Sequence, residues 1–93
     1  MISVVDNRAK LRFEAHLDAE LVGRIDYTLD GNQMSLVHTV VPPEYGGKGI
    51  ASSLAKFALE QAQATGLVVV PVCPFVVEYL ARHPEYSDVV ANS

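Results

Sequence analysis

Residues 34–70 read MSLVHTVVPPEYGGKGIASSLAKFALEQAQATGLVVV, and this stretch decides the fold. Its first part, Met34 to Val41, is apolar on both faces of a strand, which predicts a central strand that is covered on both sides. Apolar residues then recur at helical spacing from Ile50 until Thr65-Gly66, a pair typical of a helix C-terminus. A short β-branched run, Leu67 to Val70, follows at once. Strand, helix and strand in this order predict one parallel βαβ crossover.

The sequence before this stretch alternates apolar and polar residues with period two. Leu11–Leu17 and Leu21–Leu29 both do so, with the odd-numbered residues apolar, which predicts two half-buried strands. The triplet Asp30-Gly31-Asn32 is typical of a tight hairpin, so the strand that ends near Leu29 should pair antiparallel with the one that starts near Gln33. Ile2 to Asp6 is a further expected strand.

After the crossover, the pattern becomes helical again. Pro74 suits the first position of a helix, and Pro84 ends the helical pattern that follows it. The predicted fold class is therefore α+β. An antiparallel meander continues into a parallel βαβ unit, with one long helix and one short C-terminal helix.

Composition limits the functions that the chain can have. The 93 residues suffice for one domain, 1–93, and the hydrophobic and charged fractions of 49% and 19% indicate a chain that folds. A net charge of −4 argues against a nucleic-acid partner. The start lacks the pattern of a signal peptide and Cys73 is a single cysteine, so we expect a cytoplasmic protein. The longest apolar run, Leu67 to Phe75, contains two prolines and is too short to span a membrane.

The loop between the central strand and the long helix contains Gly46, Gly47 and Gly49. Glycines just before a helix allow backbone N–H groups to approach a ligand at the positive end of the helix dipole, which predicts an anion site. No Ser, Thr, Asp or Asn precedes the helix to occupy these donors. The alternative is a flexible connection whose glycines only relieve crowding.

Two common phosphate motifs do not fit this loop. A P-loop needs Ser or Thr after its Gly-Lys, whereas Lys48 is followed by Gly49. The dinucleotide fingerprint G-x-G-x-x-G fails because Ser52 stands at its last position. A nucleoside triphosphatase and a dinucleotide-dependent enzyme are therefore not supported.

From His38 to Tyr86 the chain resembles the GNAT superfamily of acyl-CoA N-acyltransferases. Within it, the match is to the short, single-domain subgroup of the "N-acetyltransferase domain-containing protein 1" type. The acetyl-CoA loop of the family has the pattern Arg/Gln-x-x-Gly-x-Gly/Ala, which Gly49 and Ala51 match, while Gly46 stands where Arg or Gln is usual. Cys-Pro-Phe-Val from residue 73 and Arg-His-Pro-Glu-Tyr from residue 82 complete the resemblance.

The resemblance implies a compact GNAT-like fold with acetyl-CoA as cosubstrate. The CoA pyrophosphate would lie on the backbone N–H groups of Gly46, Gly47, Lys48, Gly49, Ile50 and Ala51. The pantetheine would pass between splayed parallel strands, with the thioester oxygen on the backbone of Val40 or Val41, and His83 would border the CoA. Longer members carry two helices after the first strand that close over the acceptor. Residues 6–10 leave room only for a turn, so the acceptor site should be open or completed by a partner chain.

Three side chains are candidates for the chemistry. Cys73 precedes Pro74 and so lies beside a helix N-terminus, which favours the thiolate; the alternative is a small core residue. The resemblance places Tyr79 where a tyrosine protonates the departing CoA thiolate, although it could simply pack against Phe75. His38, on the same strand face as Leu36 and Val40, could deprotonate the acceptor amine or be structural.

The sequence thus predicts an enzyme that transfers an acetyl group from acetyl-CoA to a primary amine of a small molecule or protein. Attack by the amine is direct, and an acetyl-Cys73 intermediate is the minor variant. The alternative function is a CoA-binding or sensing module with little turnover. A purely structural interaction domain would leave the glycine loop unexplained. No metal is expected, because three scattered histidines and one cysteine lack ligand spacing.

Overall fold

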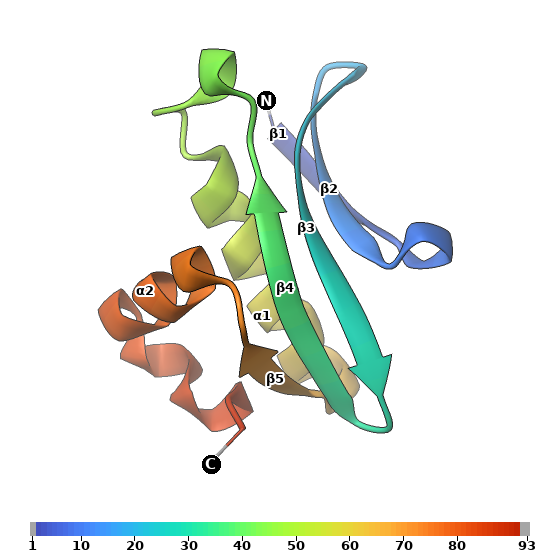
Figure 1. Ribbon diagram of the computed structural model, residues 1–93, viewed down its shortest axis with the longest axis vertical. Coiled ribbons are helices and arrows are strands. Elements are labelled where there is room, and N and C mark those ends of the chain that lie inside the picture. Colours follow the sequence, from blue (N-terminus) through green and yellow to red (C-terminus); the bar gives the residue numbers. More distant parts are fainter. Residues whose placement is uncertain (1, 92–93) are drawn as a thin grey trace.

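A computed structural model describes residues 2–91 and arranges them around one five-stranded sheet (Figure 1). The sheet order is β1-β2-β3-β4-β5, antiparallel throughout except for the parallel pair β4 and β5. The α+β class and the crossover between β4 and β5 are confirmed. The strands are β1 Ile2–Asn7, β2 Arg12–Leu17, β3 Glu20–Asp30, β4 Gln33–Val40 and β5 Val68–Pro71, and the α-helices are α1 Ile50–Thr65 and α2 Pro74–Arg82.

The hairpin between β3 and β4 forms where the sequence predicts it. Asp30 and Gln33 are the last paired residues, and Gly31 adopts φ +60° in the two-residue turn. At the other end of the meander, the 3-10 helix η1, Arg8–Lys10, joins β1 to β2. The expectation of a mere turn between these two strands is confirmed.

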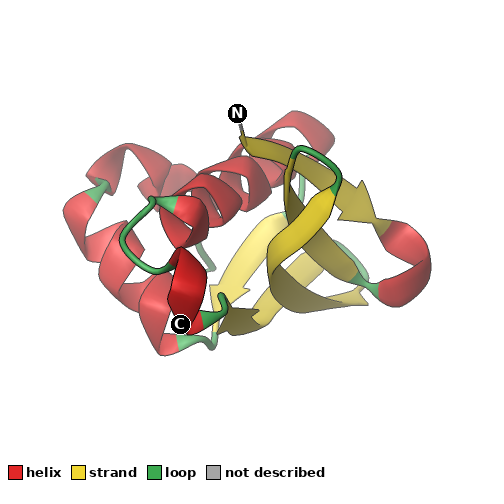
Figure 2. Ribbon diagram, turned by 90° about the horizontal axis from the view of Figure 1, so that it is seen from above, coloured by secondary structure: helices red, strands yellow, loops and turns green. Residues whose placement is uncertain are grey.

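Helix α1 covers one face of the sheet and supplies much of the core. Its residues Ile50, Leu54 and Ala58 are buried, and Phe57 meets Phe13 of β2 edge to face with ring centroids 5.7 Å apart. Gly23 lets the helix approach β3, because a Cβ atom there would lie 2.9 Å from Cγ2 of Ile50. Seen from above, the two α-helices lie to one side of the sheet (Figure 2).

The predicted alternation fails at the start of β3. Leu21 is 43% exposed and Val22 is fully buried, the reverse of the expected pattern. The register explains this, since His16 pairs with Leu21 while Ala15 pairs with Gly23, leaving Val22 as an extra residue. Because a bulge adds one residue to a strand, the side chains before it point to the opposite face from the one that a strict alternation would give them.

A second bulge corrects two expectations for β4. Tyr27 pairs with Leu36 but Asp26 pairs with His38, so Val37 is the extra residue. Val37 is 40% exposed, and the expectation that β4 is covered on both sides is wrong at this point. His38 also does not share a face with Leu36, because Leu36 faces the core with Tyr27 while His38 lies opposite Asp26 on the other face.

The C-terminal region packs at the β5 edge. Helix α2 begins at Pro74 and ends before His83, as the prolines predict, and the 3-10 helix η3, Pro84–Val89, follows it. Val90 then forms an isolated parallel bridge with Val69. Among residues 2–91, the helices are too short or too polar to cross a bilayer.

Candidate functional site

The glycine loop leads into α1 without a side-chain cap. The 3-10 helix η2, Pro43–Tyr45, leaves β4, and Gly47 and Gly49 then adopt φ +79° and +76°. Gly49 is the N-cap of α1, and among residues 2–91 no side chain caps the first turn with a hydrogen bond. The N–H groups of that turn have no acceptor within the helix, so they can serve an anion.

The loop encloses a shallow depression, called here the loop hollow. Six residues predicted to hold the cofactor lie in it, together with two others that the sequence reasoning did not select. It is lined by Val41, Tyr45, Gly46, Gly47, Gly49, Ile50, Ala51 and Ser52. Lys48 is exposed beside the hollow and does not line it, and Val40 borders a separate depression with Arg24.

A tyrosine ties the loop to the sheet. The hydroxyl of Tyr45, in η2, donates a hydrogen bond to the Glu20 carboxylate at the start of β3. This contact raises the pKa of Tyr45, as does burial to a smaller extent. Since Tyr45 also lines the loop hollow, the contact holds one wall of the hollow in place.

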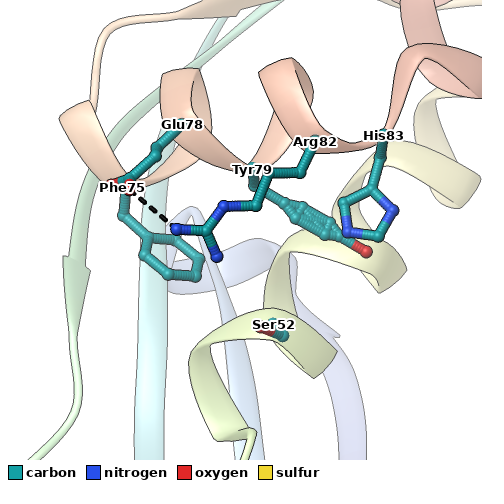
Figure 3. A pocket seen from close by; sticks show the side chains of 6 residues that line it. All are labelled: Ser52, Phe75, Glu78, Tyr79, Arg82 and His83. Carbon is teal, nitrogen blue, oxygen red and sulfur yellow. Dashed lines mark hydrogen bonds and ion pairs between the residues drawn. The ribbon is translucent and has the colours of Figure 1, made fainter.

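A second cavity, the interhelical pocket, lies between α1 and α2 and is lined by Ser52, Phe75, Glu78, Tyr79, Arg82 and His83 (Figure 3). Arg82 extends over it and pairs with Glu78 at 2.9 Å. Ser52, in the first turn of α1, lines both this pocket and the loop hollow. The two cavities therefore adjoin at Ser52.

Tyr79 and His83 form one wall of the interhelical pocket. Their rings stack with centroids 4.1 Å apart, and the Tyr79 hydroxyl lies beside the imidazole (Figure 3). Phe75 is farther away, at 6.4 Å. Burial raises the pKa of Tyr79, and so do the nearby Tyr86 and Glu85. The phenol is therefore protonated at neutral pH and able to donate a proton.

Cys73 lies at the N-cap of α2, where Pro74 predicts it, and is 5% exposed. Its Sγ lies 3.2 Å from Oγ1 of Thr39 on β4. Burial alone raises the pKa of the thiol, but hydrogen bonds from Thr39 and from the first-turn backbone of α2 outweigh it and lower the pKa. Cys73 is thus a buried residue whose hydrogen bonds favour the ionised form of its thiol.

Strands β4 and β5 separate beside Cys73. Leu36 is the last β4 residue paired with β5, and its carbonyl also accepts from the N–H groups of Val72 and Cys73, at 3.1 and 2.9 Å. In the part of the chain described, β4 continues to Val40 without a β5 partner. Figure 1 shows β5 beside only the lower part of β4, with α2 beginning where the strands part.

The predicted chemical residues lie on two sides of β4. Thr39 contacts Cys73 on the helical side, whereas His38 is exposed on the opposite face. Tyr79 and His83 lie farther along α2, in the interhelical pocket. Sequence reasoning missed Thr39, Ser52 and Arg82. The position of Ser52 three residues after Gly49, in the first turn of the helix, is the signal that could have found it.

Comparisons with known proteins agree with this architecture. Residues 12–89 match the GCN5-related N-acetyl-transferase family. A GCN5-like protein from Staphylococcus aureus, solved by NMR, superposes with a TM-score of 0.74 at 25% identity, over 98% of this chain and 89% of that one. The chain belongs to the GCN5-related N-acetyltransferase family.

Larger enzymes share part of the fold. The PaiA N-acetyltransferase of Thermoplasma acidophilum, in complex with coenzyme A, has a TM-score of 0.57 at 28% identity over 62% of this chain. The ribosomal-protein-S18-alanine N-acetyltransferase of Escherichia coli has a TM-score of 0.60 over 63% of this chain. At 15% identity, this similarity bears on the fold alone. This chain spans only 36% and 39% of their respective lengths.

Proposed function

We propose that the protein is an acetyl-CoA-dependent N-acetyltransferase, a single acetyl-CoA-binding domain that acts on a primary amine. The observation that carries the proposal is the loop hollow with its uncapped helix N-terminus, which adjoins the interhelical pocket through Ser52. The complex of the Thermoplasma PaiA enzyme with coenzyme A supports the choice of ligand. The finer resemblance to the N-acetyltransferase domain-containing protein 1 subgroup stays a prediction.

The cosubstrate would enter at the glycine loop. Its pyrophosphate lies on the N–H groups of residues 46–51, where the helix dipole favours negative charge. The pantetheine runs toward the separation of β4 and β5, and the backbone of Val40 or Val41 binds the thioester oxygen. His83 borders the cosubstrate in the interhelical pocket.

The acetyl group is transferred by direct attack of the amine on the thioester carbon. The nitrogen–carbon bond forms, the carbon–sulfur bond breaks, and the proton lost by the amine passes to His38. The departing thiolate receives a proton from Tyr79, whose raised pKa keeps its hydroxyl protonated. Cys73 suits this role less well, because a lowered pKa favours a nucleophile over a proton donor. The same property suits Cys73 to nucleophilic attack, so an acetyl-Cys73 intermediate is kept as the minor variant beside direct attack.

One observation favours a second candidate function, a CoA-binding or sensing module with little turnover. The connection between β1 and β2 is only the three-residue η1, and the sheet face beside His38 is exposed. An acceptor is then held weakly unless a partner chain completes its site.

Incubation with acetyl-CoA and a panel of primary amines separates the two functions. The enzyme is expected to release free CoA only when an amine is present. His38→Gln should lower the rate of this release to a measurable residual level, with acetyl-CoA affinity unchanged within a few-fold. Native mass spectrometry that shows bound acetyl-CoA, without CoA release for any amine, would instead support the sensing module. The intact mass of the wild type under turnover, compared with that of Cys73→Ala, decides whether an acetyl group resides on the thiol.

A further inference from the structure

The sheet face that turns away from α1, called here the open face, carries an ordered set of polar side chains. Residues directly opposite one another on neighbouring strands share a face, with Cβ atoms about 4.5–5.5 Å apart. The register places Asn7, Arg12, Asp26 and His38 in one row across β1 to β4. The adjacent row is Val5, Glu14, Arg24 and Val40, and the next contains Ser3, His16 and Leu21.

The bulge at Val37 brings His38 into this row. Without the bulge, side chains would alternate strictly along β4. His38 would then lie on the same face as Leu36, opposite a core-facing residue of β3. Because Val37 is the extra residue, Leu36 pairs with Tyr27 inside and His38 pairs with Asp26 outside. A bulge that redirects one side chain is common beside active sites.

The two carboxylates in these rows, Glu14 and Asp26, differ in how many hydrogen-bond donors they already hold. Glu14 accepts from Asn7 at 3.0 Å and Arg12 at 2.7 Å, and His16 lies at 3.3 Å, so its acceptor sites are largely used. Among the residues that the structure describes, Asp26 accepts hydrogen bonds only from Nε of Arg24, at 3.2 and 3.4 Å from its two oxygens. A carboxylate has about four acceptor sites. Asp26 therefore keeps acceptor sites for the imidazole opposite it. Among residues 2–91 the structure records no hydrogen bond or ion pair between Asp26 and His38, so the contact needs the imidazole to turn toward the carboxylate.

We propose that Asp26 is a positioning residue for His38. Once the imidazole turns toward it, the carboxylate accepts the N–H of one imidazole nitrogen, and Arg24 holds the carboxylate in place. The ring is thereby kept in one tautomer, with the lone pair of its other nitrogen free to take the proton of the acceptor amine. The other charged groups in the row of His38 and the adjacent row are Arg12, Glu14 and Arg24. This inference rests on the proposed function of His38.

A double-mutant cycle tests the proposal by kinetics. Asp26→Ala is expected to lower kcat about tenfold, a fraction of what a general base contributes, without changing the KM for acetyl-CoA. In a His38→Gln background, Asp26→Ala should cause no further loss. Asp30→Ala, at the hairpin end of the same strand, serves as the matched control. An equal loss in both backgrounds, or none in either, overturns the proposal.

A spectroscopic readout tests Asp26 independently of turnover. The ¹⁵N chemical shifts of His38 are expected to show one dominant tautomer in the wild type and a mixture in Asp26→Ala. Unchanged shifts overturn the proposal even if the protein acetylates amines. If no amine is acetylated, only the proposed function fails, and the tautomer still decides the role of Asp26. Should Asp26→Ala not fold, Asp26→Asn, which keeps the volume and removes the charge, takes its place in the kinetic cycle.

Discussion

The pKa of the Cys73 thiol depends in part on the hydroxyl of Thr39, which a single substitution removes. Thr39→Val keeps the shape of the side chain but deletes the hydrogen bond that lowers the pKa of Cys73. The backbone hydrogen bonds to the thiol remain, but with the Thr39 contribution lost the pKa of the thiol should rise. The ultraviolet absorbance of the thiolate as a function of pH measures this change. Thr28→Val, an exposed position on β3, should leave the titration unchanged, and an unshifted curve in Thr39→Val would contradict the assignment.

Glu14 links stability to pH. Its hydrogen bond from Arg12 lowers the pKa of the carboxyl against the opposing effect of burial, and Asn7 and His16 add to the lowering. A carboxyl with a lowered pKa in the folded state stabilises the fold above its unfolded pKa, near 4.3. That contribution is lost as the pH falls through the folded pKa.

We therefore expect Glu14→Gln to reduce the free energy of unfolding by about 1–3 kcal/mol at neutral pH. The difference from the wild type should shrink once the pH is below about 4. Urea unfolding across this range measures both effects. Glu78→Gln, which breaks the exposed pair with Arg82, is the control and should change stability by less than about 1 kcal/mol. A pH-independent loss in Glu14→Gln would show that packing, not charge, explains the residue.

At the scale of elements, the contact between Tyr45 and Glu20 should govern the mobility of the loop. Tyr45→Phe removes the hydrogen bond while keeping the ring. Amide hydrogen exchange of residues 46–49 should then become faster, because the wall of the loop hollow is no longer tied to β3. Glu44→Gln, an exposed change in the same 3-10 helix, should not affect exchange. Equal protection in Tyr45→Phe and the wild type would contradict this role.

Sequence patterns predicted elements well where one physical rule dominates. Apolar spacing and Gly66 define α1, while Pro74 and Pro84 set the bounds of α2, and all of these agree with the structure. The bulges at Val22 and Val37 could not be predicted, because each depends on which residues of two strands pair. Their effect on the site is large, since the second one moves His38 to the opposite face of β4.

The candidate site was likewise predictable only where a local sequence pattern defines it. The glycines of the loop predict free backbone donors from the local sequence alone, and Gly46, Gly47 and Gly49 do line one hollow. The contact between Thr39 and Cys73 joins residues 34 positions apart, and the pocket shared by Ser52 and Arg82 joins two helices. Such contacts follow from tertiary packing and leave no local pattern.

At the scale of the whole molecule, the fold places its two α-helices on one side and leaves the other face of the sheet open. Ligand binding to the folded state alone should raise its stability by about 2.7 kcal/mol at a ligand concentration 100 times Kd. Acetyl-CoA should therefore raise the melting temperature by about 10 °C or more in a domain of this size. Acetate and inorganic phosphate at the same concentration are the controls. A melting temperature that acetyl-CoA leaves unchanged would contradict binding to the folded protein.

The central claim is that the N-terminus of α1 binds acetyl-CoA through backbone amides, and isothermal titration calorimetry with a matched pair of variants tests it most directly. Gly49 and Gly66 flank the two ends of α1, with φ +76° and +73° and open space around a Cβ atom at each. Valine at either position therefore introduces comparable backbone strain, of about 1–3 kcal/mol. Only Gly49 lies in the loop hollow. We expect Gly49→Val to abolish acetyl-CoA binding and Gly66→Val to retain wild-type affinity, whereas unchanged affinity in a folded Gly49→Val would contradict the account.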